Sequence, residues 1–164
     1  LLWLDGEPES ACGEVACLVP DPLEVGLPEF AAILGARKGR IKSLLLDQTR
    51  IAGIGNIYAD EMLFDARIHP ETPADLITRP AIERLYDSMK KILAQAIEAN
   101  GSTLQDYRDA EGNEGHFQES HKVYDRKGGP CEVCGTPIRM KRIGGRSSHF
   151  CPRCQRKKAR RAPN

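Results

Sequence analysis

The sequence predicts a mainly α-helical domain followed by a small module built on a β-hairpin. Three observations support this fold class. Between residues 80 and 100, apolar residues recur at three- and four-residue steps, as on one face of an amphipathic helix. Four of the six cysteines form two Cys-x-x-Cys pairs near the C-terminus. Residues 1–120 carry 11 basic and 21 acidic side chains, whereas residues 121–164 carry 13 basic and two acidic ones.

Residues 1–27 are rich in proline, glycine and acidic residues, so we expect a linker without a long helix. The apolar start, residues 1–4, resembles the end of a strand. The 164 residues are enough for one domain, or for one domain and a small module. No run approaches the roughly 20 apolar residues of a membrane span, so we expect no membrane partner. The pairing of four cysteines indicates a metal and a reducing compartment, so we expect a cytoplasmic protein.

Helical patterns begin at Pro28, where proline suits the first turn of a helix. Helices are expected at residues 28–34, 41–46, 57–66 and 80–100. A turn with two glycines, residues 49–55, precedes the third of them, and Asn56 is the expected N-cap. Asn100 and Gly101 are expected to end the fourth.

The remaining third of the chain contains a long polar segment and the hairpin module. Residues 101–120 are polar and contain three glycines, which predicts a functional loop. Residues 121–124 and 137–140 are expected to be strands, and a basic tail follows from residue 156.

The cysteine spacing predicts a structural metal site. Cys131, Cys134, Cys151 and Cys154 follow the pattern C-x2-C-x16-C-x2-C. Two such turns supply four thiolates in a tetrahedron, the arrangement of structural zinc sites, which leave no ligand position for water. We therefore predict one structural Zn²⁺; free or redox-active cysteines are the alternative.

Two features indicate nucleic-acid binding. Basic residues cluster on the predicted hairpin, with Arg146 next to the glycines at its tip, which favours contacts to phosphates. The turn Gly53-Ile54-Gly55-Asn56 precedes a helix, and helix N-termini bind phosphate groups. A solvated basic face and an ordinary tight connection are the respective alternatives.

Three motifs resemble the formamidopyrimidine-DNA glycosylases, over residues 28–155 or so. The family's helix–two-turn–helix is matched by Leu45-Leu46-Asp47-Gln48-x-x-Ile51-Ala52-Gly53-Ile54-Gly55-Asn56-Ile57-Tyr58-Ala59-Asp60-Glu61. Its loop before the zinc finger is matched by Gly101-Ser102-Thr103-Leu104-x-Asp106-Tyr107 and Gly112-x-x-Gly115-x-Phe117. The start of its zinc finger is matched by Val123-Tyr124-x-Arg126-x-Gly128-x-Pro130-Cys131-x-x-Cys134-Gly135-Thr136-Pro137-Ile138.

The resemblance implies a base-excision repair enzyme that removes oxidised purines, such as 8-oxoguanine and formamidopyrimidines, and cleaves the abasic strand by β,δ-elimination. Its implied partner is damaged double-stranded DNA, bound by a monomer that flips the damaged nucleotide out of the duplex. The implied DNA contacts are Lys42, Gly55, Asn56 and Arg146. The implied lesion loop contains Ser102, Thr103, Tyr107, Gly115 and Phe117.

Together with composition, the resemblance implies a division of the chain into five parts. These are the end of an N-terminal β-domain with a linker (1–27), a helix–two-turn–helix domain (28–100), a lesion-recognition loop (101–120), a zinc finger (121–155) and a basic tail (156–164).

The sequence also departs from the family. Family members use an N-terminal proline amine as nucleophile, with an adjacent glutamate as acid and base. This chain opens with Leu1-Leu2, so the resemblance places no catalytic residue in it and predicts DNA binding without base excision. Asp125 replaces a glycine, and Cys12 and Cys17 match no family role. A non-catalytic nucleic-acid-binding zinc protein is the alternative function.

Overall fold

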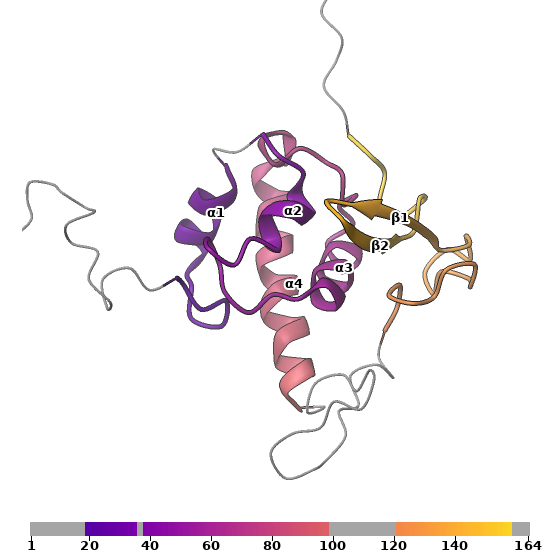
Figure 1. The fold of residues 1–164 in the computed structure, drawn as a ribbon, viewed down its shortest axis with the longest axis horizontal. Coiled ribbons are helices and arrows are strands. Elements are labelled where there is room, and N and C mark those ends of the chain that lie inside the picture. Colours follow the sequence, from indigo (N-terminus) through magenta and orange to yellow (C-terminus); the bar gives the residue numbers. More distant parts are fainter. Residues whose placement is uncertain (1–18, 36–37, 99–120, 159–164) are drawn as a thin grey trace, which may run out of the picture.

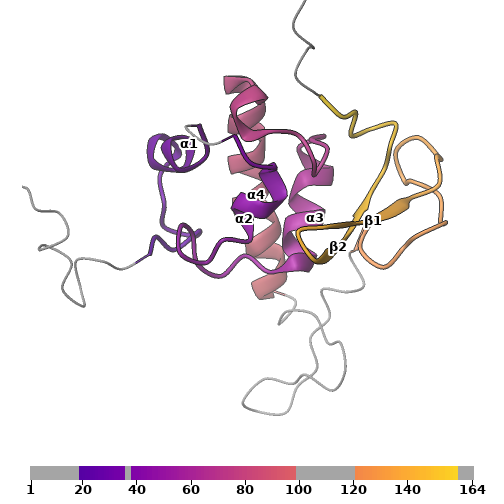
Figure 2. The ribbon, with the colours of Figure 1, turned by 45° about the horizontal axis from the view of Figure 1, so that its top comes forward.

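A computed structural model describes residues 19–35, 38–98 and 121–158 of the chain. The helices are α1 (Leu27–Gly35), α2 (Ile41–Leu45), α3 (Asn56–Asp65), the 3-10 helix η1 (Ala74–Leu76) and α4 (Arg79–Glu98). The hairpin consists of β1 (Arg139–Ile143) and β2 (Arg146–Phe150). Figures 1 and 2 show α1–α4 as one body, with the hairpin beside α3. The predicted fold class, a helical domain with a small β-hairpin module, is confirmed.

The longest helix, α4, organises the core of the helical body. Its buried face includes Ile82, Leu85, Met89 and Leu93, which recur at three- and four-residue steps as predicted. Phe30 of α1 contributes to the same core, and its ring lies 5.6 Å from that of Tyr86. None of the helices in the described ranges combines the length and apolar character needed to cross a bilayer.

The turn between α2 and α3 is fixed by its own polar side chains. The Asp47 carboxylate accepts hydrogen bonds from the backbone N–H and hydroxyl of Thr49. The Gln48 amide accepts from Gly53 N–H at 2.8 Å and donates to the Ile54 carbonyl at 3.0 Å. Gly53 has φ +86°, which suits glycine. These bonds bring the chain to the start of α3 in a single orientation.

The β-hairpin turns through two left-handed glycines, Gly144 and Gly145, as the sequence predicts. Its strands pair antiparallel, from Arg139 opposite Phe150 to Ile143 opposite Arg146. This register places Arg146 at the first position of β2, directly after the turn.

Two local predictions are wrong. Asn56 is not the N-cap of α3; Gly55 holds that position, and the Asn56 side chain instead bonds to the hairpin. Residues 121–124 form bends and the start of a turn rather than a strand, because the N–H groups of residues 122–124 donate to the Glu61 carboxylate instead of to a neighbouring strand. The predictions for residues 1–18, for the lesion loop and for residues 159–164 fall outside the described residues, and so do Cys12 and Cys17.

Candidate metal centre and nucleic-acid interface

The four predicted cysteines converge on one point. Their sulfur atoms lie within 4.8 Å of one another. The Cys131–Cys154, Cys134–Cys151 and Cys134–Cys154 sulfur pairs are separated by 3.8, 3.5 and 3.7 Å. A tetrahedron with zinc–sulfur bonds of about 2.3 Å has edges of about 3.8 Å. The donor set and its spacing therefore fit a single zinc ion.

The backbone around the cysteines is arranged to support thiolates. Val133 N–H donates to Cys131 Sγ, and Cys154 N–H donates to Cys151 Sγ. Hydrogen bonds with Thr136 lower the pKa of Cys134 to about 6, whereas burial raises the pKa of Cys151 and that of Cys154. Binding of a zinc ion by these sulfurs would therefore release protons. Four thiolates fill a tetrahedral shell, so the site is structural, and zinc contributes folding free energy rather than a reactive water.

A buried glutamate of α3 fixes the start of the zinc finger, residues 121–155. The Glu61 carboxylate accepts hydrogen bonds from the N–H groups of Lys122, Val123 and Tyr124, at 2.6, 3.0 and 2.9 Å. Burial raises the pKa of Glu61, and the three N–H groups oppose that change. Phe64, one turn later, packs into the apolar cluster of the finger with Val123. Helix α3 therefore carries the finger on one side.

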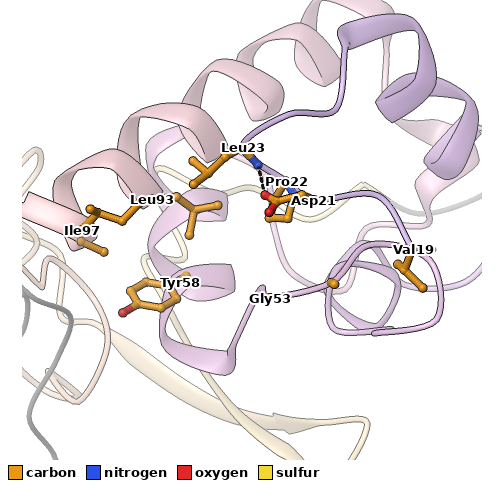
Figure 3. A pocket seen from close by; sticks show the side chains of 10 residues that line it. Val19, Asp21, Pro22, Leu23, Gly53, Tyr58, Leu93 and Ile97 are labelled. Carbon is orange, nitrogen blue, oxygen red and sulfur yellow. Dashed lines mark hydrogen bonds between the residues drawn. The ribbon is translucent and has the colours of Figure 1, made fainter. Parts of the chain in front are cut away.

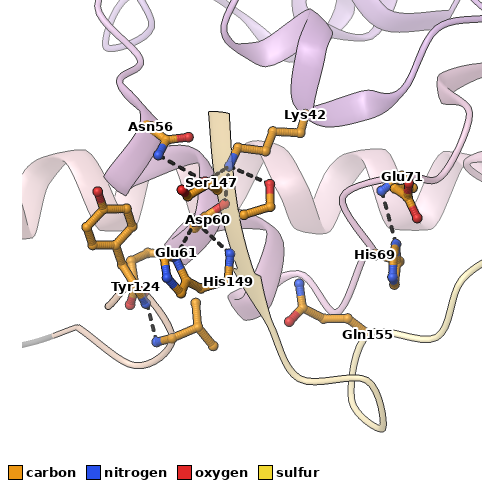
Figure 4. A network of polar contacts seen from close by, with 12 residues as sticks. Lys42, Asn56, Asp60, Glu61, His69, Glu71, Tyr124, Ser147, His149 and Gln155 are labelled. Atoms are coloured by element: carbon orange, nitrogen blue, oxygen red, sulfur yellow. Dashed lines mark hydrogen bonds and ion pairs between the residues drawn. The ribbon is translucent and has the colours of Figure 1, made fainter. Parts of the chain in front are cut away.

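A second acidic residue of α3 holds strand β2. Asp60 forms an ion pair with Lys42 of α2 at 2.7 Å, and both side chains are buried, with exposed fractions of 1% and 0%. The second Asp60 oxygen accepts His149 N–H at 3.0 Å. Lys42 Nζ also donates to Ser147 O at 2.8 Å and to Ser148 Oγ at 2.5 Å. Figure 4 shows these groups meeting around β2.

The predicted phosphate-binding groups lie on two neighbouring elements. Gly55 caps α3, and Asn56 is its first helical residue. The Asn56 amide donates to Ser147 O at 3.0 Å, one residue after the exposed Arg146. The finger tip is thereby joined to the N-terminus of α3. Lys42 is near this point but has no exposed surface, so its predicted phosphate contact stays a prediction.

A second group of charges surrounds the buried acid Glu71, beside strand β1. Lys141 and Lys157 each lie close to the Glu71 carboxylate, at 3.0 and 3.1 Å. Burial would raise the pKa of Glu71, but hydrogen bonds from the two lysines lower it below its usual value. The ring of His69 packs on Phe150, with centroids 4.6 Å apart. These contacts attach the base of the finger to the loop after α3.

Sequence reasoning missed Asp60, Glu61, Ser148 and His149 as interface residues. The available signal was the position of Asp60 and Glu61, directly before the apolar residues Met62–Phe64 of the same helix. Asn56, Asp60 and Phe64 are spaced four residues apart, so they share one face of α3. Asn56 and Asp60 make the N-terminal part of this face polar, and polar residues on a buried helix face indicate a polar partner.

The structure also contains an apolar pocket away from the finger. The pocket has a volume of about 520 Å³ and lies between residues 19–23, the turn at Gly53 and the C-terminal end of α4 (Figure 3). Leu23, Tyr58, Leu93 and Ile97 form much of its wall. Among the lining residues Asp21 is the charged one, and its carboxylate accepts Leu23 N–H. This lining offers no pair of groups for acid–base chemistry.

Comparison with protein families identifies both parts of the chain. The family described as Formamidopyrimidine-DNA glycosylase H2TH domain matches residues 18–108. The family described as Zinc finger found in FPG and IleRS matches residues 128–156. The second match covers all four cysteines and Arg146, which agrees with the zinc-site geometry.

Individual relatives give the same result. The formamidopyrimidine-DNA glycosylase of Solibacter usitatus is 54% identical over 143 residues, covering 87% of this chain and 54% of that protein. The MutM (Fpg) crystal structure from Thermus thermophilus has a TM-score of 0.81 at 45% identity, covering 87% of this chain and 55% of that chain. Lactococcus lactis Fpg, in a complex with abasic-site DNA, has a TM-score of 0.79 at 39% identity, covering 85% and 52%.

The chain spans about half the length of the relatives that it matches. Within that half, the family matches agree with the cysteine cluster and with the helix–two-turn–helix geometry. The chain therefore belongs to the formamidopyrimidine-DNA glycosylase family, of which it carries the H2TH domain and the zinc finger.

Proposed function

We propose that this chain is the DNA-binding region of a base-excision repair glycosylase and AP lyase that acts on oxidised purines. Its partner is damaged double-stranded DNA, which it binds as a monomer. Alone, this chain binds DNA but does not excise bases. Support comes from the family matches and from the structure of the Lactococcus lactis relative, which is a complex with abasic-site DNA.

One observation carries the proposal: the finger tip and the N-terminus of α3 are joined. Asn56 at the start of α3 bonds to Ser147 O at 3.0 Å, and Arg146 is the adjacent exposed cation. A helix N-terminus presents free N–H groups and the positive end of a dipole. A backbone phosphate placed here would contact both the N-terminus of α3 and the Arg146 guanidinium. A neighbouring phosphate would contact the rest of the finger. Gly55, Asn56 and Arg146 are the proposed contacts.

The remaining parts of the chain fit the same function. We assign the helix–two-turn–helix domain to residues 28–100 and the finger to residues 121–155, with a lesion loop at residues 101–120 between them. In this proposal Ser102, Thr103, Tyr107, Gly115 and Phe117 approach the flipped base. Residues 1–27 connect to a catalytic β-domain, and residues 156–164 add positive charge.

Binding experiments test the proposal directly. The 164-residue chain should bind an abasic-site DNA duplex more tightly than undamaged DNA and more tightly than an RNA duplex of equal length. Fluorescence anisotropy with labelled duplexes measures the three dissociation constants. Equal affinity for RNA and abasic DNA would instead support a non-catalytic nucleic-acid-binding protein.

Replacing Arg146 by alanine should weaken binding about equally on duplexes of different sequence, because phosphates are common to all of them. The dependence of log K on log salt should become shallower by about 0.9, the value for one phosphate contact. Arg79→Ala is the matched control, since Arg79 is an exposed arginine at the start of α4. A loss confined to one sequence would contradict a phosphate contact.

A further inference from the structure

We propose that Lys42 is a positioning residue: it holds the finger tip so that Arg146 stands beside the N-terminus of α3, and it does not itself contact a phosphate. The inference rests on the proposed DNA-binding function and deepens it. It changes the role of a basic residue that the sequence resemblance places among the DNA contacts.

The first argument is that the Lys42 ammonium is buried and enclosed by oxygen atoms of the protein. Its exposed fraction is 0%, and it has three acceptors within 2.8 Å, one from Asp60 and two from β2. A lysine ammonium has three N–H groups and no other polar capacity. A phosphate could reach it only by opening the buried site and displacing one of these partners.

The second argument is the identity of the acceptors. Lys42 belongs to α2 and Asp60 to α3, whereas Ser147 and Ser148 are the two residues that follow Arg146 in β2. The ammonium therefore joins both parts of the interface at one atom.

The third argument is that one carbonyl receives two donors from different helices. Ser147 O accepts Lys42 Nζ at 2.8 Å and Asn56 Nδ2 at 3.0 Å. His149 N–H, two residues later, is held by Asp60 at 3.0 Å. Three consecutive residues after Arg146 are thus attached to α2 and α3, and the arginine is the first residue beyond them.

The finger tip also lies directly against α2. A Cβ atom built on Gly144 would be 3.2 Å from Ser43 Oγ, next in sequence to Lys42. Gly145 has a similar left-handed φ of +81°, yet a Cβ there would meet nothing within 4 Å. The contact between tip and α2 is therefore specific to one side of the turn, and this difference provides a matched pair of variants.

A double-mutant cycle on DNA affinity tests the proposal. Lys42→Met, Arg146→Ala and the double variant are measured against an abasic-site duplex, after zinc content and melting show that each is folded. If Lys42 acts through Arg146, Lys42→Met weakens binding about tenfold alone but changes it by less than about twofold in the Arg146→Ala background. If the loss of affinity in the double variant equals the product of the two single losses, the proposal is overturned, because two independent phosphate contacts give that result.

Lys42→Arg separates position from charge. An arginine keeps the charge and binds phosphate at least as well as lysine, so it would restore a direct phosphate contact. Its larger planar head does not fit the buried site among three acceptors. We therefore expect Lys42→Arg to bind DNA as weakly as Lys42→Met, and wild-type affinity in this variant would overturn the proposal.

A second pair of variants keeps the test decisive if changes at Lys42 unfold the protein. Gly144→Ala should weaken binding severalfold more than Gly145→Ala, and Ser43→Ala should restore part of that loss. No difference between the two glycine variants would overturn a role for tip position. Failure of the proposed function is distinguishable, because the wild-type chain would then bind DNA without dependence on Arg146.

Discussion

Asp60 and Glu61 are neighbours in the sequence, yet they hold two different parts of the zinc finger. Asp60 accepts a hydrogen bond from the backbone N–H of His149 in β2. Glu61 accepts hydrogen bonds from three backbone N–H groups that precede the first zinc-binding cysteine. Carboxylates that accept several N–H groups are stable when buried, because each hydrogen bond offsets the cost of lost hydration. Two adjacent acids thus orient a module that is itself basic.

The buried Lys42–Asp60 pair predicts a pH dependence of stability. Burial lowers the pKa of Lys42 below its unfolded value of 10.5, although Asp60 opposes the shift. In the window below pH 10.5, the unfolded chain therefore binds more protons than the folded one. Because of this difference, the free energy of unfolding increases as the pH rises there.

Urea unfolding of wild type and Lys42→Met between pH 7 and about pH 10.5 measures this contribution. The stability difference between the two proteins should grow in favour of wild type as pH rises through the upper part of that window. Met at this position also removes the lysine partner of the buried Asp60 carboxylate, so the variant should be less stable by about 3–5 kcal/mol at neutral pH. Parallel curves would show that the lysine titrates alike in both states.

At the scale of elements, the helical body and the finger have separate apolar cores. The large cluster includes Phe30, Leu85 and Met89, whereas the finger contributes Val123, Cys131, Ile138 and Cys151 with Phe64 of α3. The small cluster contains two of the metal-binding cysteines. The stability of the small cluster therefore depends on zinc more directly than that of the large cluster, which contains no metal-binding cysteine.

Chelation of zinc should unfold residues 131–154 and abolish tight DNA binding while α1–α4 stay folded. Structural zinc in small peptides contributes on the order of 10 kcal/mol, more than so small a cluster can replace. Circular dichroism monitors the helices, and anisotropy monitors DNA binding in the same samples. Unchanged affinity after verified metal loss would refute the prediction.

Local patterns predicted most of these elements, and long-range contacts explain the rest. The apolar spacing through Leu85 and Met89, the cysteine spacing and the glycines at the hairpin turn all act within a few residues. The bond from Lys42 to Ser147, by contrast, joins residues 105 positions apart. No periodicity encodes such a pair. The same reason explains Asn56, whose short-range preference for capping is overridden by a bond to the finger.

For the whole molecule, the net charge of +1 conceals a strong separation of charge. The helical part is acidic, and the finger and tail are basic, so a polyanion meets positive charge at one end of the molecule. Several lysines of the finger are already paired with acids, including Lys141 with Glu71. Arg146 is exposed at the tip and lies beside the N-terminus of α3, which favours it as a phosphate contact.

Incubation with an 8-oxoguanine duplex and borohydride tests whether this chain alone can react. If this chain binds DNA and a separate β-domain carries the catalytic residues, the 164-residue chain should form no covalent adduct. A full-length relative treated in parallel provides the positive control. An adduct that vanishes in Lys42→Met would identify that lysine as a nucleophile. Such a result would contradict both the proposed role of Lys42 and the division of labour.

The arrangement of contacts along α3 limits how this protein can change by insertion or deletion. Asn56, Asp60 and Phe64 meet the finger from one face of the helix, and the cap of the same helix faces the proposed phosphate site. One inserted residue would rotate everything after it by about 100° and carry the finger away from the helix cap. The number of residues in α3 is therefore fixed by the need to keep its N-terminal cap and the finger in one orientation.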